Sequence, residues 1–236
     1  MSRARQRLIV ALDVDNVEEA RTLIGRLGDS VGVYKIGLEL LFAGGFSLAS
    51  ELASNGHAIF IDAKLLDIEA TVERATAAIA KTGAQFLTVH ATDCKTLQAA
   101  VRGRGTSALK LLGVTVLTNL GGADLVQQGI DHPPAELVLH RAMLAREAGF
   151  DGVVASGQEA ATIRQNAGAG FLIVTPSIRP KGNEAHDQAR TMTPAEAIAA
   201  GADYLVVGRP IIRAADPRAA AEAIAEEIAR ALPKPG

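Results

Sequence analysis

The sequence predicts an α/β protein built as a single (β/α)8 TIM barrel. Short apolar runs rich in β-branched residues recur eight times, and amphipathic, Ala-rich segments separate them. The apolar runs are nearly continuous, which is typical of parallel strands covered on both faces. Eight strand–helix units within 236 residues match the size of one barrel, so we expect residues 1–236 to form one domain.

The expected strands follow one another at steady spacing along the chain. The first four, RLIVALDV, GVYKIGLE, HAIFIDAK and QFLTVHA, occupy residues 7–14, 32–39, 57–64 and 85–91. The last four, LKLLGVTVLT, DGVVASG, GFLIVTPS and DYLVVGRP, occupy residues 109–118, 151–157, 170–177 and 203–210.

Amphipathic segments between these runs predict the helices that cover the barrel. The clearest are 17–28, 70–83, 134–149 and 193–201, with a further helix at 217–231 near the C-terminus. Several close with Gly just before the next strand, as expected for a helix C-cap. The main alternative fold is an open doubly wound sheet, which favours a Gly-rich turn after the first strand. The stretch ALDVDNVEEA contains no glycine, so we prefer the barrel.

Composition excludes several functional classes. Aromatic residues make up only 3% of the chain and the formal charge is −2, so we expect neither a nucleic-acid partner nor a membrane partner. The single cysteine, Cys94, rules out an intrachain disulfide framework and fits a reducing compartment. The basic N-terminus leads into an apolar stretch that is too short for a signal peptide. We therefore expect a cytoplasmic protein.

Charged and polar side chains gather where the expected strands end. In a barrel, the C-terminal ends of the strands carry the catalytic groups. Asp62 and Lys64 are two residues apart, so on a strand they project to the same side. The residues at these ends are Asp13, Lys35, Asp62, Lys64, His90 and Thr118.

An alternating array of Asp and Lys keeps each group ionised, because opposite charges lower the pKa of Asp and raise the pKa of Lys. It can also present one ammonium as a proton donor beside a fixed carboxylate. The structural alternative is a buried ion-pair network that only sets the strand register. Buried ion pairs are weak devices for stability alone, so we prefer the functional interpretation.

Other polar residues carry weaker signals. Asp67 precedes the expected helix at 70–83 and, taken alone, reads as its N-cap. His90 could act as a base, although a single His at such a position is more often structural. The other histidines have no recognisable ligand spacing, so we predict no metal site; they are His57, His132, His140 and His186.

The last two expected strands point to a phosphate site. Barrels often bind phosphate at the loops after strands 7 and 8. Gly208 permits close approach of the backbone, and Arg209 can donate to phosphate oxygens, with Arg179 as a second cation. The long segment 177–192 is a candidate lid over the active site.

Taken together, these motifs resemble the orotidine 5′-monophosphate decarboxylase family over nearly the whole chain. Asp-x-Lys-x-x-Asp alone also occurs in related barrel enzymes, and the full set of motifs in order is more specific. The matching motifs are ALD (11–13), YKIG (34–37), DAKLLDI (62–68), VLT (116–118), TPSIRP (175–180), DQAR (187–190), TP (193–194) and VVGRP (206–210).

The resemblance implies decarboxylation of orotidine 5′-monophosphate to uridine 5′-monophosphate, the last step of de novo pyrimidine synthesis, without a cofactor. It implies a homodimer with shared active sites, to which Asp67 and Thr71 come from the partner chain. Lys64 would protonate C6 of the pyrimidine. The implied catalytic residues are Lys35, Asp62, Lys64 and Asp67. The implied substrate-binding residues are Asp13 and Thr71 at the ribose, Thr118 at the pyrimidine, and Gln188, Arg179, Gly208 and Arg209 at the phosphate.

The chain departs from the family pattern at several positions. Glu69 and Ala70 replace the usual Pro and Asn, and Leu66 stands where His is frequent. Asp93 and Cys94 replace a pair of glycines. Ser177 replaces Gly in the TPGIRP motif, which matters for lid geometry because Gly tolerates backbone angles that Ser does not.

Three other functions remain open from the sequence. A Mg²⁺-dependent decarboxylase acting on a keto-gulonate phosphate would typically have Glu where this chain has Lys35. A phosphosugar aldolase or isomerase on the same scaffold would use a Schiff-base lysine or a carboxylate base. A non-catalytic binder of phosphorylated ligands would not need all four charged residues.

Overall fold

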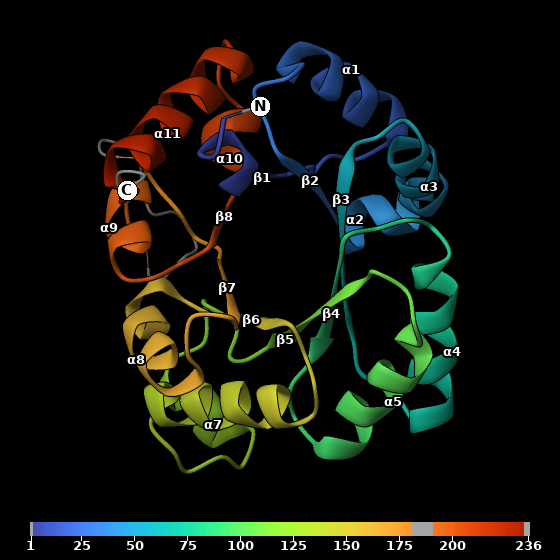
Figure 1. The fold of residues 1–236 in the computed structure, drawn as a ribbon, viewed down its shortest axis with the longest axis vertical. Coiled ribbons are helices and arrows are strands. Elements are labelled where there is room, and N and C mark those ends of the chain that lie inside the picture. The colour runs from blue at the N-terminus through green and yellow to red at the C-terminus, as the bar shows by residue number, and fades with distance from the viewer. Residues whose placement is uncertain (1, 181–190, 234–236) are drawn as a thin grey trace.

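The protein closes eight parallel strands into one barrel, in sequence order (Figure 1). The computed structural model describes residues 2–180 and 191–233. β1 pairs with both β2 and β8, so the predicted barrel is confirmed and the open sheet is wrong. The strands are β1 (Leu8–Ala11), β2 (Val33–Gly37), β3 (Ala58–Leu65), β4 (Phe86–His90), β5 (Lys110–Val114), β6 (Gly152–Val154), β7 (Leu172–Thr175) and β8 (Tyr204–Val207).

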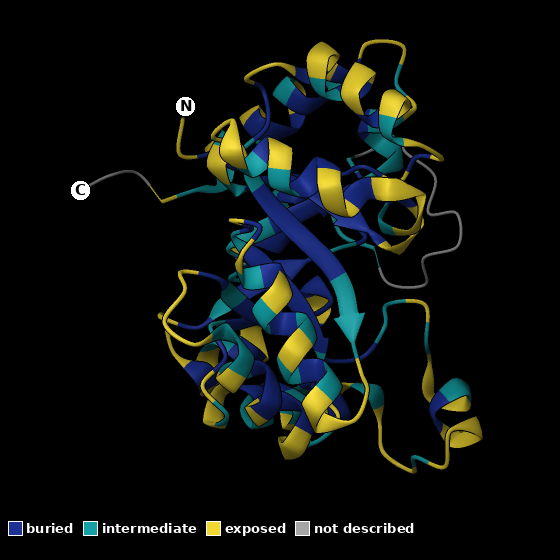
Figure 2. Cartoon of the chain, turned by 90° about the vertical axis from the view of Figure 1, so that its right-hand side faces the viewer, coloured by how far each residue is buried: buried dark blue, intermediate teal, exposed yellow. Residues whose placement is uncertain are grey.

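Helices surround the barrel, and their outward faces are exposed while the strands inside are buried (Figure 2). Within the described ranges, no helix is both long and apolar enough to cross a membrane. A 3-10 helix, η1 (Arg5–Arg7), precedes β1, and a π-helical segment, η2 (Leu41–Gly45), follows α2. The helices are α1 (Val17–Leu27), α2 (Leu38–Leu40), α3 (Phe46–Ser54), α4 (Glu69–Ala80), α5 (Cys94–Arg104), α6 (Gly122–Gln127), α7 (Pro134–Glu147), α8 (Gly157–Ala167), α9 (Pro194–Ala199), α10 (Arg209–Ile212) and α11 (Pro217–Ala231).

Local signals set the helix ends largely as predicted. Gly28, Gly105 and Gly168 are C-caps with positive φ, a conformation that glycine adopts without steric cost. The expected fifth strand, 109–118, was too long. β5 ends at Val114, and the apolar residues after it form a loop that lines the cavity at the mouth of the barrel.

Two apolar clusters follow from the alternation of side chains along each strand. The larger cluster lies between the strands and the helices, as Leu8 and Val10 of β1 illustrate. The smaller one fills the barrel, where the rings of Phe60, Phe86 and Tyr204 meet edge to face. This packed interior fills the barrel beneath the cavity at the C-terminal ends of the strands.

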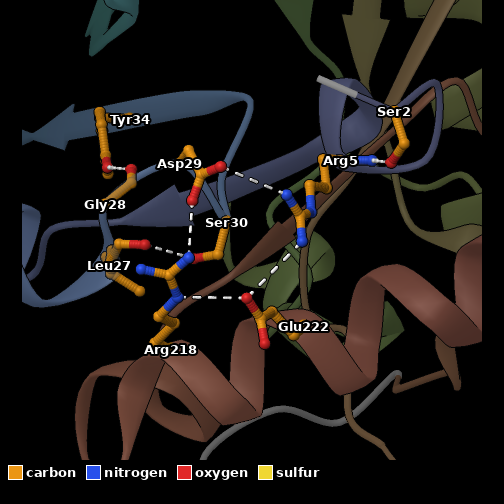
Figure 3. Close-up of polar contacts among 9 residues, drawn as sticks. All are labelled: Ser2, Arg5, Leu27, Gly28, Asp29, Ser30, Tyr34, Arg218 and Glu222. Carbon is orange, nitrogen blue, oxygen red and sulfur yellow. Dashed lines mark hydrogen bonds and ion pairs between the residues drawn. The ribbon is translucent and has the colours of Figure 1, made fainter.

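An ion-pair network ties the N-terminal turn to α11 and to the loop after α1 (Figure 3). The guanidinium of Arg5 lies 3.6 Å from both Asp29 and Glu222. Arg218 donates to Asp29 at 2.8 Å and to Glu222 at 3.2 Å. These contacts join the two ends of the chain where β1 meets β8.

Candidate active site

Along each of the first four strands, the inward-facing side chains lead up to the charged and polar residues of the site. Each series begins in the packed interior and becomes polar at the C-terminal end, since side chains two residues apart share a face. The series are Ile9, Ala11 and Asp13 from β1, Val33 and Lys35 in β2, Phe60 and Asp62 in β3, and Phe86, Thr88 and His90 in β4.

Three of the four predicted catalytic side chains meet at this level. The ammonium nitrogen of Lys35 lies 3.1 Å from Oδ1 of Asp13 and 3.3 Å from Oδ2 of Asp62. The ammonium nitrogen of Lys64 lies 2.9 Å from the same Oδ2 of Asp62. The predicted alternating array is therefore confirmed, in the order Asp13, Lys35, Asp62, Lys64.

Burial and charge act in opposite directions on this array. Lys35 and Asp62 are each only 8% exposed. Burial alone would lower the pKa of Lys35, but Asp62 and Asp13 outweigh it, so its pKa is raised. Burial alone would raise the pKa of Asp62, but Lys35 and Lys64, with hydrogen bonds from Lys64 and Thr88, hold that pKa below its usual value. Both groups are therefore charged at neutral pH.

The backbone at Lys64 is strained. Its φ is 48°, in the left-handed region that costs a non-glycine residue about 1–2 kcal/mol. The β3–β4 pairing shifts register here, because Ile61 faces Leu87 but Leu65 faces Val89. The sequence predicted correctly that Asp62 and Lys64 would meet, although the strand between them is irregular rather than evenly pleated.

Gly37 leaves the space that the Lys35 ammonium occupies. A Cβ atom at this position would lie 2.9 Å from Nζ of Lys35 and 3.4 Å from Oδ1 of Asp13. Any larger residue would push Lys35 away from its carboxylates.

The array forms one side of a cavity of about 300 Å³ at the mouth of the barrel. Apolar side chains such as Phe60, Val114 and Val154 line part of its wall. The predicted binding residues that also line it are Asp13, Thr118, Arg179, Gly208 and Arg209. The cavity thus combines a charged group of four residues, an apolar surface and two arginines, which suits a ligand with a planar ring and an anionic tail.

Comparisons with known proteins agree with this arrangement. Residues 6–224 match the model of the orotidine 5'-phosphate decarboxylase / HUMPS family. The chain belongs to this family. It is 55% identical over 225 residues to an orotidine 5'-phosphate decarboxylase of Rhodopseudomonas palustris (strain BisA53), covering 95% of each chain. It is 53% identical over 230 residues to the enzyme of that name from Methylobacterium nodulans, covering 96% of this chain and 97% of that one.

Solved structures show the same fold. The crystal structure of orotidine 5'-phosphate decarboxylase from Lactobacillus acidophilus aligns with a TM-score of 0.82 at 39% identity. The alignment covers 94% of this chain and 98% of that chain. An uncharacterized conserved protein from Geobacillus kaustophilus aligns with a TM-score of 0.80 at 35% identity, covering 94% and 99% of the two chains.

Two predicted residues lie apart from the cavity within one chain. Asp67 is exposed in the loop between β3 and α4, and Thr71 is half-buried in the first turn of α4. The alternative interpretation of Asp67 as a helix cap is wrong, because α4 begins at Glu69 with Ile68 as N-cap and no capping side chain. Asp67 instead accepts a hydrogen bond from the backbone N–H of Ile68 at 2.6 Å.

Part of the predicted lid lies outside the described residues, and so does Gln188. The described ends of this segment, 177–180 and 191–192, meet at the mouth of the barrel. Ile178 and Met192 form a parallel bridge, and the backbone N–H of Arg179 donates to the carbonyl of Met192 at 2.9 Å. The hydroxyl of Ser177 donates to Oγ1 of Thr118 at 2.9 Å.

Sequence reasoning missed two residues that support the site. Thr88 is fully buried and contacts both Asp62 and Lys64, but a Thr within an apolar strand reads as an ordinary β-branched residue. Asn119 lines the cavity next to Thr118, and its position after the predicted strand was the only signal.

His90 lies half-buried at the end of β4. Burial, followed by the charges of Lys64 and Arg141, lowers its pKa despite the opposing effect of Asp62. It is therefore neutral near pH 7.

The described part of the chain brings together no group of three or more His, Cys, Asp or Glu side chains that could hold a metal ion.

Proposed function

We propose that this protein decarboxylates orotidine 5′-monophosphate to uridine 5′-monophosphate without a cofactor. Support comes from its membership of the family and from close relatives that carry the name of this activity. The single observation that carries the proposal is the array of Lys35, Asp62 and Lys64 at the wall of a cavity that also holds two arginines.

The array suits a reaction that leaves negative charge on carbon. When the C6 carboxylate departs as CO₂, the electron pair of the broken bond stays on C6. The ammonium of Lys64 stabilises this charge and then transfers a proton to C6, leaving a neutral amine that regains its proton from water. Lys64 is held by Asp62 at 2.9 Å, so its ammonium is aimed before the substrate binds.

Asp62 has a second role in this scheme. Its carboxylate remains charged because Lys35 and Lys64 hold its pKa down. A substrate carboxylate placed beside it is repelled, and this repulsion is relieved as CO₂ leaves. Lys35 keeps the carboxylates of Asp13 and Asp62 in place through contacts of 3.1 and 3.3 Å.

The same cavity also supplies cations for the phosphate. Arg179 and Arg209 both line it, and Gly208 between β8 and α10 presents its backbone there without a side chain. Binding energy gained at the phosphate, which does not react, serves to hold the pyrimidine against the array.

A homodimer would complete the site. Large exposed apolar side chains cluster on the segments that follow the neighbouring strands β2 and β3, and such patches mark interaction surfaces. Among the described residues, the remaining side chain of this kind is Val126. Asp67 and Thr71 belong to the same region. A second copy bound there would bring its own Asp67 and Thr71 to this chain's cavity. The cluster consists of Leu38, Phe42, Phe46, Leu66 and Ile68.

The activity is tested with purified, chelator-treated protein and orotidine 5′-monophosphate, by measuring uridine 5′-monophosphate and CO₂. We expect turnover without added metal. Absence of turnover would contradict the proposal. A keto-gulonate phosphate with Mg²⁺ would then be the next substrate, and borohydride trapping would test for an aldolase.

Shared active sites are tested by mixing two inactive variants, Lys64→Ala and Asp67→Ala. In a mixed dimer, one site takes Lys64 from one chain and Asp67 from the other, and is intact. Random exchange makes half of the dimers mixed, so about a quarter of the native sites return. No recovery after subunit exchange would show that Asp67 does not serve the partner's site.

A further inference from the structure

We propose that Thr88 is a positioning residue for the decarboxylation, whose hydroxyl fixes the carboxylate of Asp62 and the backbone of Lys64 at the same time. This inference rests on the proposed function and assigns a role to a residue outside the array of charged side chains. Thr88 lies on β4, two residues after Phe86 on the inward face, and its exposed fraction is 0%.

The hydroxyl of Thr88 makes two hydrogen bonds of opposite sense. It donates to Oδ1 of Asp62 at 2.8 Å, and it accepts from the backbone N–H of Lys64 at 3.0 Å. A hydroxyl has one proton to donate, and a backbone N–H can only donate, so the direction of both bonds is determined. The single side chain therefore links the two residues that would act on the substrate.

The irregularity of β3 explains why this link is required. Between two register pairs, Ile61 with Leu87 and Leu65 with Val89, β3 has three residues where β4 has only Thr88. The N–H of Lys64 therefore has no regular strand partner in β4. The Thr88 hydroxyl takes the place of that partner, and it holds Lys64 at a φ of 48°.

The same hydroxyl fixes which oxygen of Asp62 faces the two ammonium groups. Oδ1 is held by Thr88, while Oδ2 faces the ammonium groups of both Lys35 and Lys64. Without the hydroxyl, the carboxylate could rotate and exchange these oxygens. The aim of Lys64 would then change along with the orientation of Asp62.

The test compares Thr88→Val, which removes the hydroxyl and keeps the shape, with Thr88→Ser, which keeps the hydroxyl. Thr175→Val is the matched control. Thr175 is a fully buried barrel threonine whose hydroxyl has no hydrogen-bond partner within the described structure. If Thr88→Val does not fold, Thr88→Ala serves as the second variant without a hydroxyl.

We expect kcat for orotidine 5′-monophosphate to fall about tenfold or more in Thr88→Val, with KM changed less than about threefold. Thr88→Ser should restore most of kcat, and Thr175→Val should resemble the wild type. Equal losses in the Val and Ser variants, an unchanged kcat in Thr88→Val, or a loss confined to KM would overturn the proposal.

A second measurement does not depend on turnover. The carboxyl carbon of Asp62 is titrated by NMR in each variant, and its pKa should rise in Thr88→Val but not in Thr175→Val. If the wild type lacks decarboxylase activity, the proposed function fails, and this titration alone decides whether Thr88 holds Asp62. An unchanged titration of Asp62 in Thr88→Val would reject the role of Thr88.

Discussion

Lys64 and Lys35 share a single carboxylate oxygen, Oδ2 of Asp62, at 2.9 and 3.3 Å. This oxygen lies on a side chain that is almost fully buried. Removal of this charge would take from Lys64 the carboxylate that holds it and would leave Lys35 with Asp13 alone, in a cavity wall.

Neutralising Asp62 should accordingly destabilise the fold. We expect Asp62→Asn to lower the free energy of unfolding by about 3–5 kcal/mol, the usual cost of breaking a buried ion pair. Urea denaturation at matched protein concentration measures it. The control is Glu51→Gln, which removes the exposed partner of Arg21 and should cost far less because water screens that pair. Equal losses in the two variants would contradict this account.

The pKa of His90 reports the charge of Lys64. Because burial, Lys64 and Arg141 lower this pKa, Lys64→Ala should raise it, and NMR titration of the ring protons measures the change. The folded pKa is below the unfolded one, so the stability that neutral His90 contributes is present above about pH 6.5 and is lost as the pH falls through the folded pKa. An unchanged titration in Lys64→Ala would exclude the coupling.

Ser177 adopts a backbone angle that favours glycine. Its φ is 63°, so Ser177→Gly should be more stable than Ser177→Ala by about 1 kcal/mol. Both variants lose the hydrogen bond to Thr118, so their difference isolates the backbone. At Gly25, inside α1 and with no atom within 4 Å of an added Cβ, Gly→Ala should be stabilising instead. If Ala were the more stabilising residue at position 177 as well as at position 25, this interpretation would be refuted.

The proposed dimer surface is tested at its most exposed side chain. Phe42 is 89% exposed, and Phe42→Glu should shift the protein toward monomers and reduce turnover, because Asp67 could no longer reach the partner's site. Sedimentation velocity gives the oligomeric state. Val126→Glu, on α6 and outside the cluster, should leave both properties unchanged. A fully active monomer of Phe42→Glu would exclude shared sites.

The barrel and most of the site could be predicted because they depend on short-range patterns. Alternating side chains bring Asp13, Lys35 and Asp62 to the inward face near the strand ends, and parallel strands in sequence order place them side by side. The cavity residues Thr118, Arg179 and Arg209 followed from their places at the end of the fifth expected strand and in the loops after the last two, and they line the same space.

The remaining features depend on contacts that no local pattern encodes. The role of Thr88 arises from the register shift between β3 and β4. This shift changes neither the hydrophobic pattern nor the spacing of the strands in the sequence. The backbone of Ser177 was suspected only because the family has glycine there, and its positive φ bears out that concern. The proposed role of Asp67 depends on a dimer, which a single chain does not contain.

Direct action of Lys64 on orotidine 5′-monophosphate is tested by comparing kcat/KM of three chelator-treated proteins. They are the wild type, Lys64→Ala and the control Lys81→Ala, which alters an exposed lysine at the end of α4. We predict that Lys81→Ala matches the wild type while Lys64→Ala loses about a thousandfold or more. A Lys64→Ala enzyme with kcat/KM within about tenfold of the wild type would rule out this role of Lys64.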